Sequence, residues 1–282
     1  MRESNGVKYS VLMSLYEGEE VAYLKESIES MLAQTYPADE IVVVKDGPLT
    51  KALETTLDEF ESNYKGQFKF VKLEKNEGLG PALKAGISAC RNEWIVRMDA
   101  DDVAVPNRCE RQIQELDKQP DLDMICSNYY EFHGDKEDCV LRNSPEKHEE
   151  IIKFARRRNP FGHCCMMYRK SRVLEAGNYG EHFPSVEDYD LWIRMFMKGC
   201  RCYNIQEPLV YVRGNKNFYG RRGGVAYWRK IMNFFSEYRR QGFFGWKDYL
   251  ISCTARTIVY LFPVGLRTFI YRTMLREKAN RG

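Results

Sequence analysis

The sequence lacks any apolar run long enough to cross a lipid bilayer, which takes about 20 residues. The longest apolar run in the C-terminal part, Ile258 to Leu266, is interrupted by Pro263 and Gly265. Near the N-terminus, a short apolar stretch is followed at once by acidic residues, which is not the form of a signal peptide. We therefore expect a cytoplasmic protein without a transmembrane anchor.

Disulfide and zinc-binding patterns are also missing. The nine cysteines include no C-x-x-C pair, and the four histidines are scattered. The spacings of Cys164–Cys165 and of Cys200 and Cys202 suit neither a zinc ribbon nor a redox motif. We expect reduced, mostly buried thiols, as in cytosolic proteins.

Two nucleotide-binding motifs do not occur. The first predicted strand leads into the acidic segment SLYEGEE (14–20) rather than G-x-G-x-x-G, which disfavours a dinucleotide-dependent dehydrogenase. The absence of G-x-x-x-x-G-K-[ST] argues against P-loop hydrolysis. The Gly-rich segment NEGLGPALKAG (76–86) can contact a diphosphate or simply form a turn.

Charge is distributed unevenly along the 282 residues. The net charge is +3, but residues 239–282 hold nine Lys or Arg against two acids, and the preceding part is acidic. In the tail, Leu266, Phe269, Ile270 and Met274 share one helical face beside arginines. Such a helix can lie on an anionic membrane surface, or the same face can pack on the main domain. No nucleic-acid recognition motif accompanies the basic residues, so no such partner is expected.

The first 130 residues alternate between short segments rich in β-branched residues and longer amphipathic ones. This alternation predicts an α/β fold with a doubly wound, mostly parallel sheet and helices on both faces. Ligands of such sheets bind at the carboxyl ends of the strands. The predicted strands are 9–15, 40–46, 68–74, 93–99 and 124–132, with an extended segment at 163–169. The predicted helices are 21–35, 49–64, 80–90, 106–118, 146–158, 185–199, 224–241, 246–262 and 264–276.

Three carboxylates stand directly behind the fourth strand, in RMDADD. Asp99, Asp101 and Asp102 would repel one another on a turn unless they share a hard divalent cation. An EF-hand loop fails because the next residues supply neither the required ligand nor the turn glycine. A phosphoaspartyl transferase would place such a motif after its first strand, and capping of the next helix needs only one acid. The cluster therefore favours a metal site.

Two further acidic segments accompany this cluster. Asp46, in VVVKDGP, fits a plain turn almost equally well, but its position at a strand end brings it to the same crevice. EDYDLW begins a helix with Glu187, Asp188 and Asp190. Acids in a first helical turn usually serve the helix dipole. Together with the other strand-end carboxylates, one of them can act as a general base.

The ordered set of these motifs resembles the family-2 inverting glycosyltransferases of GT-A fold. The motifs are, in chain order, SVLMSLYEGEE, VVVKDGP, KNEGLGPALKAG, RMDADD with PNR, and EDYDLW. EEIIKFARRRNPFGH and YGRRGG are similar to the amylovoran-type branch, which builds exopolysaccharides, capsules and O-antigens. The resemblance spans residues 8–276. It implies a catalytic domain over 1–223, with a nucleotide-sugar half of about 1–105 and an acceptor half of about 106–223. A helical, basic extension follows over 224–282.

The resemblance assigns roles on the donor side. Ser14, Tyr16 and Glu17 fall in a segment similar to the nucleotide-contacting loop of the family. Asp46 matches the carboxylate that hydrogen-bonds the uracil base.

It also assigns the metal and the catalytic groups. Asp101 matches the ligand of Mn²⁺ or Mg²⁺, and Asp99 matches the acid that faces the nucleotide sugar at the metal. Asp188 matches the catalytic base, with Glu187 beside it near the acceptor.

Together these matches imply transfer of one sugar, galactose or glucose, from a UDP-sugar to a lipid-diphosphate-linked saccharide with inversion, at the inner face of the cell membrane. A processive synthase is not expected, because there is no Q-x-x-R-W motif.

Arg221 and Arg222, in YGRRGG, either add positive charge to a diphosphate or form a solvated loop. The alternatives are a nucleotidyltransferase, which would carry a basic Gly-rich loop after the first strand, and a non-catalytic binding module, which would not need Asp188.

Overall fold

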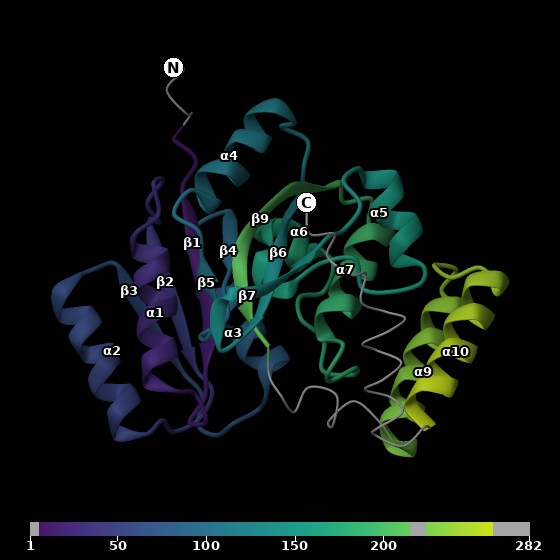
Figure 1. Ribbon diagram of the computed structural model, residues 1–282, viewed down its shortest axis with the longest axis horizontal. Helices are drawn as coiled ribbons and strands as arrows, with labels where there is room; N and C mark the ends of the chain where they lie inside the picture. Colours follow the sequence, from purple (N-terminus) through teal and green to yellow (C-terminus); the bar gives the residue numbers. More distant parts are fainter. Residues whose placement is uncertain (1–5, 215–223, 262–282) are drawn as a thin grey trace.

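The structure is a computed structural model that describes residues 6–214 and 224–261 of the chain. Figure 1 shows a central sheet flanked by helices, with α2 at one end of the molecule and α9 and α10 at the other. The N-terminal half consists of β1 (Tyr9–Leu15), α1 (Val21–Leu32), β2 (Glu40–Lys45), α2 (Lys51–Asn63), β3 (Phe68–Lys72), α3 (Leu79–Ala89) and β4 (Trp94–Arg97).

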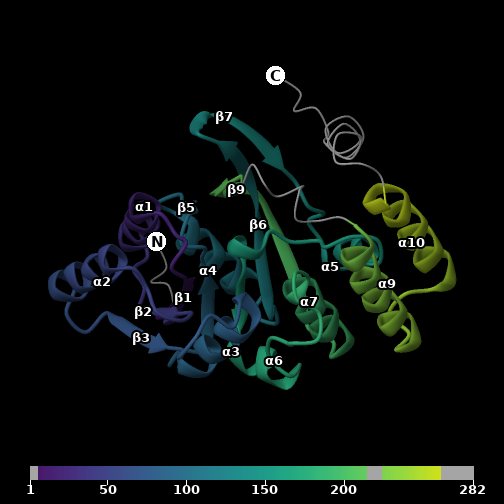
Figure 2. The same cartoon turned by 90° about the horizontal axis from the view of Figure 1, so that it is seen from below.

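The four strands of this half are parallel and lie in the order β3-β2-β1-β4. Every residue of β2 and all but one of β1 are buried, as expected for central strands covered on both faces. Figure 2 shows α1 and α2 on one face and α3 on the other. Right-handed crossovers require this placement when the strand order reverses at β1. The doubly wound sheet that the sequence predicts is confirmed.

The α3 helix lies unusually close to the sheet at Gly86. A Cβ atom at this position would come within 2.3 Å of Leu12 Cδ1 and 2.8 Å of Val44 Cγ2. Only a residue without a side chain permits this approach. Gly86 therefore fixes the distance between α3 and the two central strands.

The second half continues the same sheet with strands of both directions, in the order β4-β8-β6-β9-β5, with β7 paired to β6. The β6 and β9 strands are parallel, whereas β8, β5 and β7 pair antiparallel with their neighbours. The elements are β5 (Val103–Ala104), α4 (Arg108–Lys118), β6 (Met124–His133), β7 (Asp135–Arg142), α5 (His148–Ala155), the 3-10 turn η1 (His163–Cys165), β8 (Met167–Arg169), α6 (Lys170–Glu175), α7 (Glu187–Met197) and β9 (Cys202–Arg213).

Two of these strands have sequences that are not typical of β-strands. The β7 strand, DKEDCVLR, is largely polar and is formed by pairing with β6 alone. The β9 strand contains Pro208, and its register with β6 shifts on either side of Asn128. Tertiary pairing overrides local propensity in both cases. In the predicted extended segment 163–169, the 3-10 turn precedes the short β8 strand.

The C-terminal helices α9 (Val225–Arg240) and α10 (Trp246–Leu261) lie side by side at the edge of the molecule (Figures 1 and 2). Their inner faces form a second apolar core with α7. Its buried members are Tyr189, Ile193, Ile231, Phe234, Phe235, Tyr238, Phe244 and Tyr260. The predicted helix 264–276 lies outside the described residues. Among the helices that the structure describes, none has the length and apolar content needed to cross a membrane.

Candidate active site

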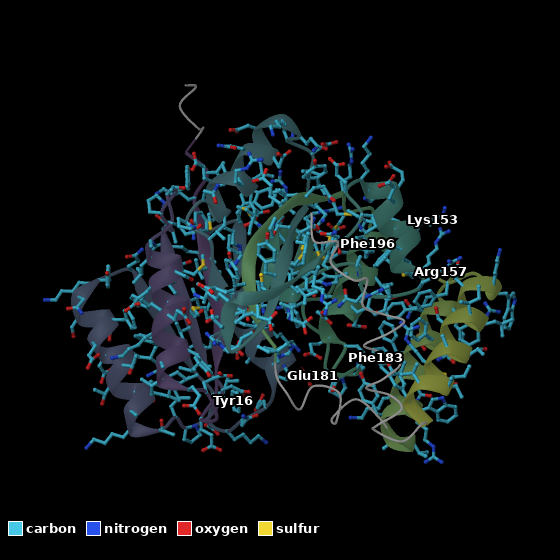
Figure 3. All side chains as sticks on the ribbon, viewed as in Figure 1. Tyr16, Lys153, Arg157, Glu181, Phe183 and Phe196 are labelled. Carbon is cyan, nitrogen blue, oxygen red and sulfur yellow. The ribbon has the colours of Figure 1, made fainter. Side chains whose placement is uncertain are left out.

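The carboxyl ends of β1, β2 and β4 meet at one edge of the sheet, because the three strands are parallel. The Met98 N–H donates to the Leu12 carbonyl at 3.0 Å, and the Asp46 N–H donates to the Leu15 carbonyl at 2.8 Å. Tyr16, in the loop after β1, lies on this edge, and Glu181 lies farther along it (Figure 3). The loops after these strands therefore lie next to one another at the edge where ligands of such sheets bind.

The loop after β4 holds the acidic cluster. Arg97 is almost fully buried and forms an ion pair with the half-exposed Asp99. The Ser27 hydroxyl donates to the Asp99 carbonyl at 2.7 Å, which ties the loop to α1. Asp102 is buried, and its Oδ1 accepts from the Arg213 N–H at 2.8 Å, whereas its Oδ2 has no hydrogen-bond partner among the described residues.

The cluster holds more negative charge than its neighbours compensate. Burial and the Asp99 carboxylate raise the pKa of Asp101 to about 6. Burial, with Asp99 and Asp101, raises the pKa of Asp102 well above its usual range. Burial, with Asp101 and Asp99, raises the pKa of Glu19 to about 7. A divalent cation would reverse these shifts by favouring the ionised carboxylates.

Glu19 therefore belongs to the acidic cluster, a role that the sequence analysis did not assign. The predicted loop residue Glu17 is exposed, and Tyr16 is 42% exposed. Ser14 is half-buried near the end of β1. The acidic segment SLYEGEE indicates that an acid of this loop could join the cluster. Which of its acids faces the cluster depends on the turn after Tyr16, which the sequence does not show.

The described residues contain one group of donor atoms close enough to share a cation. Oxygens of Asp99 and Asp102 and the Cys164 sulfur lie within 4.8 Å of one another. The two carboxylates fit Mn²⁺ or Mg²⁺, and the unpartnered Asp102 oxygen is a donor available to such an ion. A hydrogen bond with Cys165 and burial raise the pKa of the Cys164 thiol, so this sulfur stays protonated and is a poor ligand. Asp101 is not part of this group.

All nine cysteines are unpaired, and most are buried, as the sequence predicts.

The PNR motif after the acidic loop holds the end of β4. Arg108 is fully buried in α4, and its Nη2 donates to the Arg97 carbonyl at 2.9 Å. Its Nη1 lies 3.2 Å from the Met98 sulfur. This side chain therefore fixes the backbone from which the acidic loop starts.

The end of β9 closes the acidic loop from the other side. The Arg213 Nε donates to the Asp101 carbonyl at 3.0 Å, and its Nη2 binds Glu26 Oε2 at 2.7 Å. The guanidinium stacks on the rings of Tyr23 and Phe132, at 3.7 and 4.7 Å from the centroids. Arg213 thus joins α1, β6 and the acidic loop, a contact that sequence reasoning missed because β9 was not predicted.

Asp46 is buried at the end of β2 and holds the loop before α3. Its two carboxylate oxygens accept from the backbone N–H groups of Glu77 and Gly78, at 2.7 and 3.0 Å. Gly47 has a φ of +86°, and a Cβ there would lie 2.5 Å from the Asn76 nitrogen. The D-G-P segment is therefore a tight turn that also aims the carboxylate at the start of α3.

The acid-rich start of α7 lies across from the acidic loop. Asp188 Oδ2 accepts from the Asn159 side-chain amide at 2.6 Å, and its Oδ1 accepts from the Tyr189 N–H at 2.7 Å. Burial and Asp188 raise the pKa of the neighbouring Glu187, whose Oε2 is buried without a hydrogen-bond partner in the described chain. Asp190 instead pairs with Arg194 at 2.7 Å and faces α9.

The charge of Arg97 acts on both acidic segments. Its charge pairs with Asp99 and also lowers the pKa of Glu187, opposing the effect of burial. His163 lies beside it, and burial together with the Arg97 charge lowers the pKa of this imidazole well below its usual value. The neutral His163 ring bonds the Tyr179 hydroxyl at 2.8 Å. The buried Arg97 cation thus influences acids of both the acidic loop and the start of α7. Arg221 and Arg222 lie outside the described residues.

Comparison with known proteins identifies the family. The model of Glycosyl transferase family 2 matches residues 10–177. The UDP-Gal:alpha-D-GlcNAc-diphosphoundecaprenol beta-1,3-galactosyltransferase of Escherichia coli is 31% identical over 96% of this chain and 97% of its own. The amylovoran biosynthesis glycosyltransferase AmsE of Erwinia amylovora is 35% identical over 97% of this chain and 100% of its own.

The fold agrees with a solved structure of the same kind. The crystal structure of S. aureus TarS 1–349 in complex with UDP-GlcNAc superposes with a TM-score of 0.68. The match covers 96% of this chain and 76% of that chain at 16% identity, so it supports the fold alone. The GT-A fold that the motifs imply is confirmed. With the match over residues 10–177 and relatives above 30% identity along nearly its whole length, the chain belongs to glycosyl transferase family 2.

Proposed function

We propose that this glycosyltransferase moves a single sugar, galactose or glucose, from a UDP-sugar to a lipid-diphosphate-linked saccharide with inversion of the anomeric centre. The observation that supports it most directly is the cluster of Asp99, Asp101 and Asp102 on the turn after β4, at the edge of the sheet where the carboxyl ends of the parallel strands lie. One side of the site carries groups suited to a diphosphate and its cation. The other carries a carboxylate suited to an incoming hydroxyl.

On the donor side, Ser14, Tyr16 and Glu17 belong to the loop after β1, where the nucleotide would lie. Asp46 already holds two backbone N–H groups, and each of its oxygens keeps a lone pair for the N–H of a uracil ring. UDP as carrier is further supported by the names of the E. coli relative and of the TarS complex.

Asp101 and Asp99 would hold Mn²⁺ or Mg²⁺, and the unpartnered Asp102 oxygen beside them is available as a further ligand. When bound, such a cation stabilises the charge that develops on the departing nucleoside diphosphate. The protein itself keeps the carboxylates in place through Arg97, Arg108 and Arg213. This support keeps the loop geometry fixed before substrate arrives.

Asp188 is the proposed general base. Its Oδ2 is held by Asn159, and its second oxygen by the backbone of α7, so the carboxylate has a fixed orientation. It takes the proton of the acceptor hydroxyl as that oxygen attacks the anomeric carbon. Attack opposite the leaving group inverts the configuration. Glu187 lies next to it and would position the acceptor.

A lipid-linked acceptor is favoured by the name of the E. coli relative, which acts on a diphosphoundecaprenol-linked sugar. A protein with this acceptor has to work at a membrane surface, and we propose the inner face of the cell membrane. We therefore propose a peripheral, membrane-surface location for the enzyme.

The proposed function is tested by measuring UDP release from a panel of UDP-sugars with a synthetic lipid-diphosphate sugar as acceptor. We expect turnover with UDP-galactose or UDP-glucose and a product whose anomeric configuration, read by NMR, is opposite to that of the donor. Retention of configuration would contradict the role of Asp188. Transfer of a nucleotide to a sugar phosphate would instead support the nucleotidyltransferase alternative.

A further inference from the structure

A pocket of about 500 Å³ lies between α5 and α10, away from the acidic loop. Four cationic side chains line it against two carboxylates. Figure 3 shows Lys153 and Arg157 on the side of the molecule that carries α10. The lining residues are His148, Glu149, Ile152, Lys153, Arg156, Arg157, Lys247 and Asp248.

Half of this positive charge is uncompensated, because the four cations face two carboxylates. Arg157 is paired with Asp248 at 3.2 Å. Lys153, Arg156 and Lys247 are exposed and form no ion pair with any residue that the structure describes. Together with the carboxylate of Glu149, these three cations leave the pocket with a net positive charge, which attracts a multiply charged anion more strongly than the same charges scattered over the surface.

An apolar stripe lies directly beside this pocket, on the outer face of α10. Trp246, Leu250, Ile251 and Ile258 are 63, 56, 44 and 49% exposed. At 100° per residue they fall within an arc of about 140°, and Lys247 lies inside the same arc. The opposite side of α10, at Ser252 and Tyr260, is buried. One face of α10 therefore packs on the protein, and the other presents apolar side chains and a cation to the surroundings.

The tryptophan end of the stripe carries further positive charge. The Arg239 guanidinium stacks on the Trp246 ring, 3.4 Å from its centroid. Indole rings and basic side chains are the groups that favour the boundary between lipid headgroups and acyl chains. A soluble acidic partner would match the cations but not the adjoining apolar stripe.

The pocket is also connected to the proposed acceptor side of the active site. Arg156 precedes Asn159 by three residues, which can span at most about 11 Å of backbone. Asn159 holds Asp188 through the 2.6 Å hydrogen bond. A bilayer against this face would place its headgroups near the start of α7.

From these observations we infer that the α5–α10 face, made of Lys153, Arg156, Lys247, Trp246, Leu250 and Ile258, docks on an anionic phospholipid bilayer. The cations bind lipid phosphates, and the α10 stripe enters the headgroup layer. The purpose of this contact rests on the proposed lipid-linked acceptor, but the binding itself does not require catalysis.

The test is sedimentation of the full-length protein with vesicles of phosphatidylcholine, with and without phosphatidylglycerol. We expect binding to the anionic vesicles only, and weaker binding as salt shortens the Debye length. Each cation near an anionic surface contributes about fivefold in affinity. The triple variant Lys153→Gln, Arg156→Gln, Lys247→Gln should therefore lower the partition coefficient by about 100-fold.

The matched control makes the same charge change at the far end of the molecule. Lys51, Lys65 and Lys72 are exposed and form no ion pair within the described chain. Their triple change to Gln should alter binding by less than about threefold. If it weakens binding as much as the pocket variant, net charge alone governs the interaction. If the parent binds neutral vesicles equally or anionic ones not at all, the inference fails.

Two further measurements separate the apolar contribution to membrane binding from the electrostatic one, and membrane binding from catalysis. Leu250→Ser should lower binding to anionic vesicles at high salt, where the apolar contact dominates. Unchanged binding would show that the apolar stripe is not part of the membrane-docking surface. In the pocket variant, the rate of sugar transfer to a water-soluble acceptor analogue should stay within about twofold of the parent rate. If the parent itself shows no transfer but binds vesicles as described, the proposed function fails while the docking surface stands.

Discussion

At the scale of single residues, the site is organised by the excess of four acids over the cations that reach them, Arg97 and Arg213. Asp99 has Arg97 as its partner, whereas Asp101, Asp102 and Glu19 have raised pKa values because they are buried close to other carboxylates. A protein seldom keeps such repulsion without use, because each shifted carboxylate lowers stability once it ionises. The cluster is thus poised to gain stability from a bound cation.

This gain should depend on pH. Glu19 and Asp101 have folded-state pKa values of about 7 and about 6, above ordinary values of 4.5 and 3.8. Because the folded state binds these protons more tightly, the cation-free protein loses stability as pH rises from about 4 to about 7. A cation favours the ionised acids, so the stabilisation by Mn²⁺ over EDTA should grow through that window. Thermal unfolding at pH 5, 6 and 7.5 measures this difference.

The variant Glu19→Gln removes one of the titrating acids and should flatten this pH dependence. A Mn²⁺ stabilisation that is equal at pH 5 and pH 7.5, or absent at both, would show that the cluster does not bind the ion. Replacing the exposed Glu17 by Gln is the matched control and should leave the dependence unchanged.

Asp188 offers the sharpest catalytic test. Asn keeps the size of Asp and can still accept one of the two hydrogen bonds, from Asn159 or from the Tyr189 N–H, but it takes no proton near neutral pH. General-base catalysis typically contributes about 10²- to 10⁴-fold, so Asp188→Asn should lower kcat by that range. Binding of the UDP-sugar, measured by calorimetry, should change little.

Glu187→Gln should be milder, because Glu187 is proposed to position the acceptor rather than to take its proton. If Glu187→Gln is the more damaging change, Glu187 is the base and the assignment shifts by one residue. If Asp188→Asn instead loses donor binding with intact chemistry, the carboxylate belongs to the donor side.

At the scale of the elements, the contact of α3 with the sheet depends on one missing side chain. Gly86→Ala would place a methyl group against Leu12 and Val44, both fully buried in β1 and β2. Overpacking of this kind costs about 1–3 kcal/mol. We expect that loss in the free energy of unfolding measured with urea. Gly245→Ala, where nothing lies within 4 Å of the new Cβ, is the control and should differ little from the parent. Equal effects of the two changes would contradict the close packing of α3.

The elements also explain how far the sequence alone could be followed. The parallel half was predictable, because its strands are buried runs and its helices have clear apolar faces, as in YSVLMSL at β1. The predicted strand 9–15 coincides with β1, and the predicted helix 80–90 differs from α3 by one residue at each end. The strands β7 and β9 were not predictable, since one is polar and the other contains Pro208.

The same reasoning applies to the site. Its acids stood out because strand ends rarely carry clustered carboxylates, and the structure places Asp99, Asp101 and Asp102 on the turn after β4. The groups that hold them could not be found this way. Arg213 reaches the cluster because it lies at the end of β9, a strand that was not predicted. Arg97 is indistinguishable in the sequence from an ordinary strand residue, because its burial is visible only in the structure.

At the scale of the whole molecule, the question is whether α9 and α10 form an appendage or part of the catalytic body. Tyr238 of α9 donates to the Asp190 carboxylate on α7, and Arg256 of α10 donates to the Arg157 carbonyl at 2.8 Å. The apolar residues between them are as deeply buried as the main core. Because α7 begins with Glu187 and Asp188, the C-terminal pair supports the helix that carries the proposed base.

We therefore expect α9 and α10 to unfold together with the catalytic domain in one transition. Phe234 is fully buried against Tyr189 of α7, with ring centroids 5.1 Å apart. Phe→Ala changes in cores cost about 3–5 kcal/mol, so Phe234→Ala should lower the free energy of unfolding by that amount. Leu250→Ala, on the exposed face of α10, should cost less than about 0.5 kcal/mol. Hydrogen exchange should show faster exchange at the start of α7 as well as in α9 in the Phe234 variant. If α9 and α10 instead exchange freely while α7 stays protected and sugar transfer is intact, the two helices are an independent appendage, and Asp188 is held by Asn159 and the α7 backbone without them.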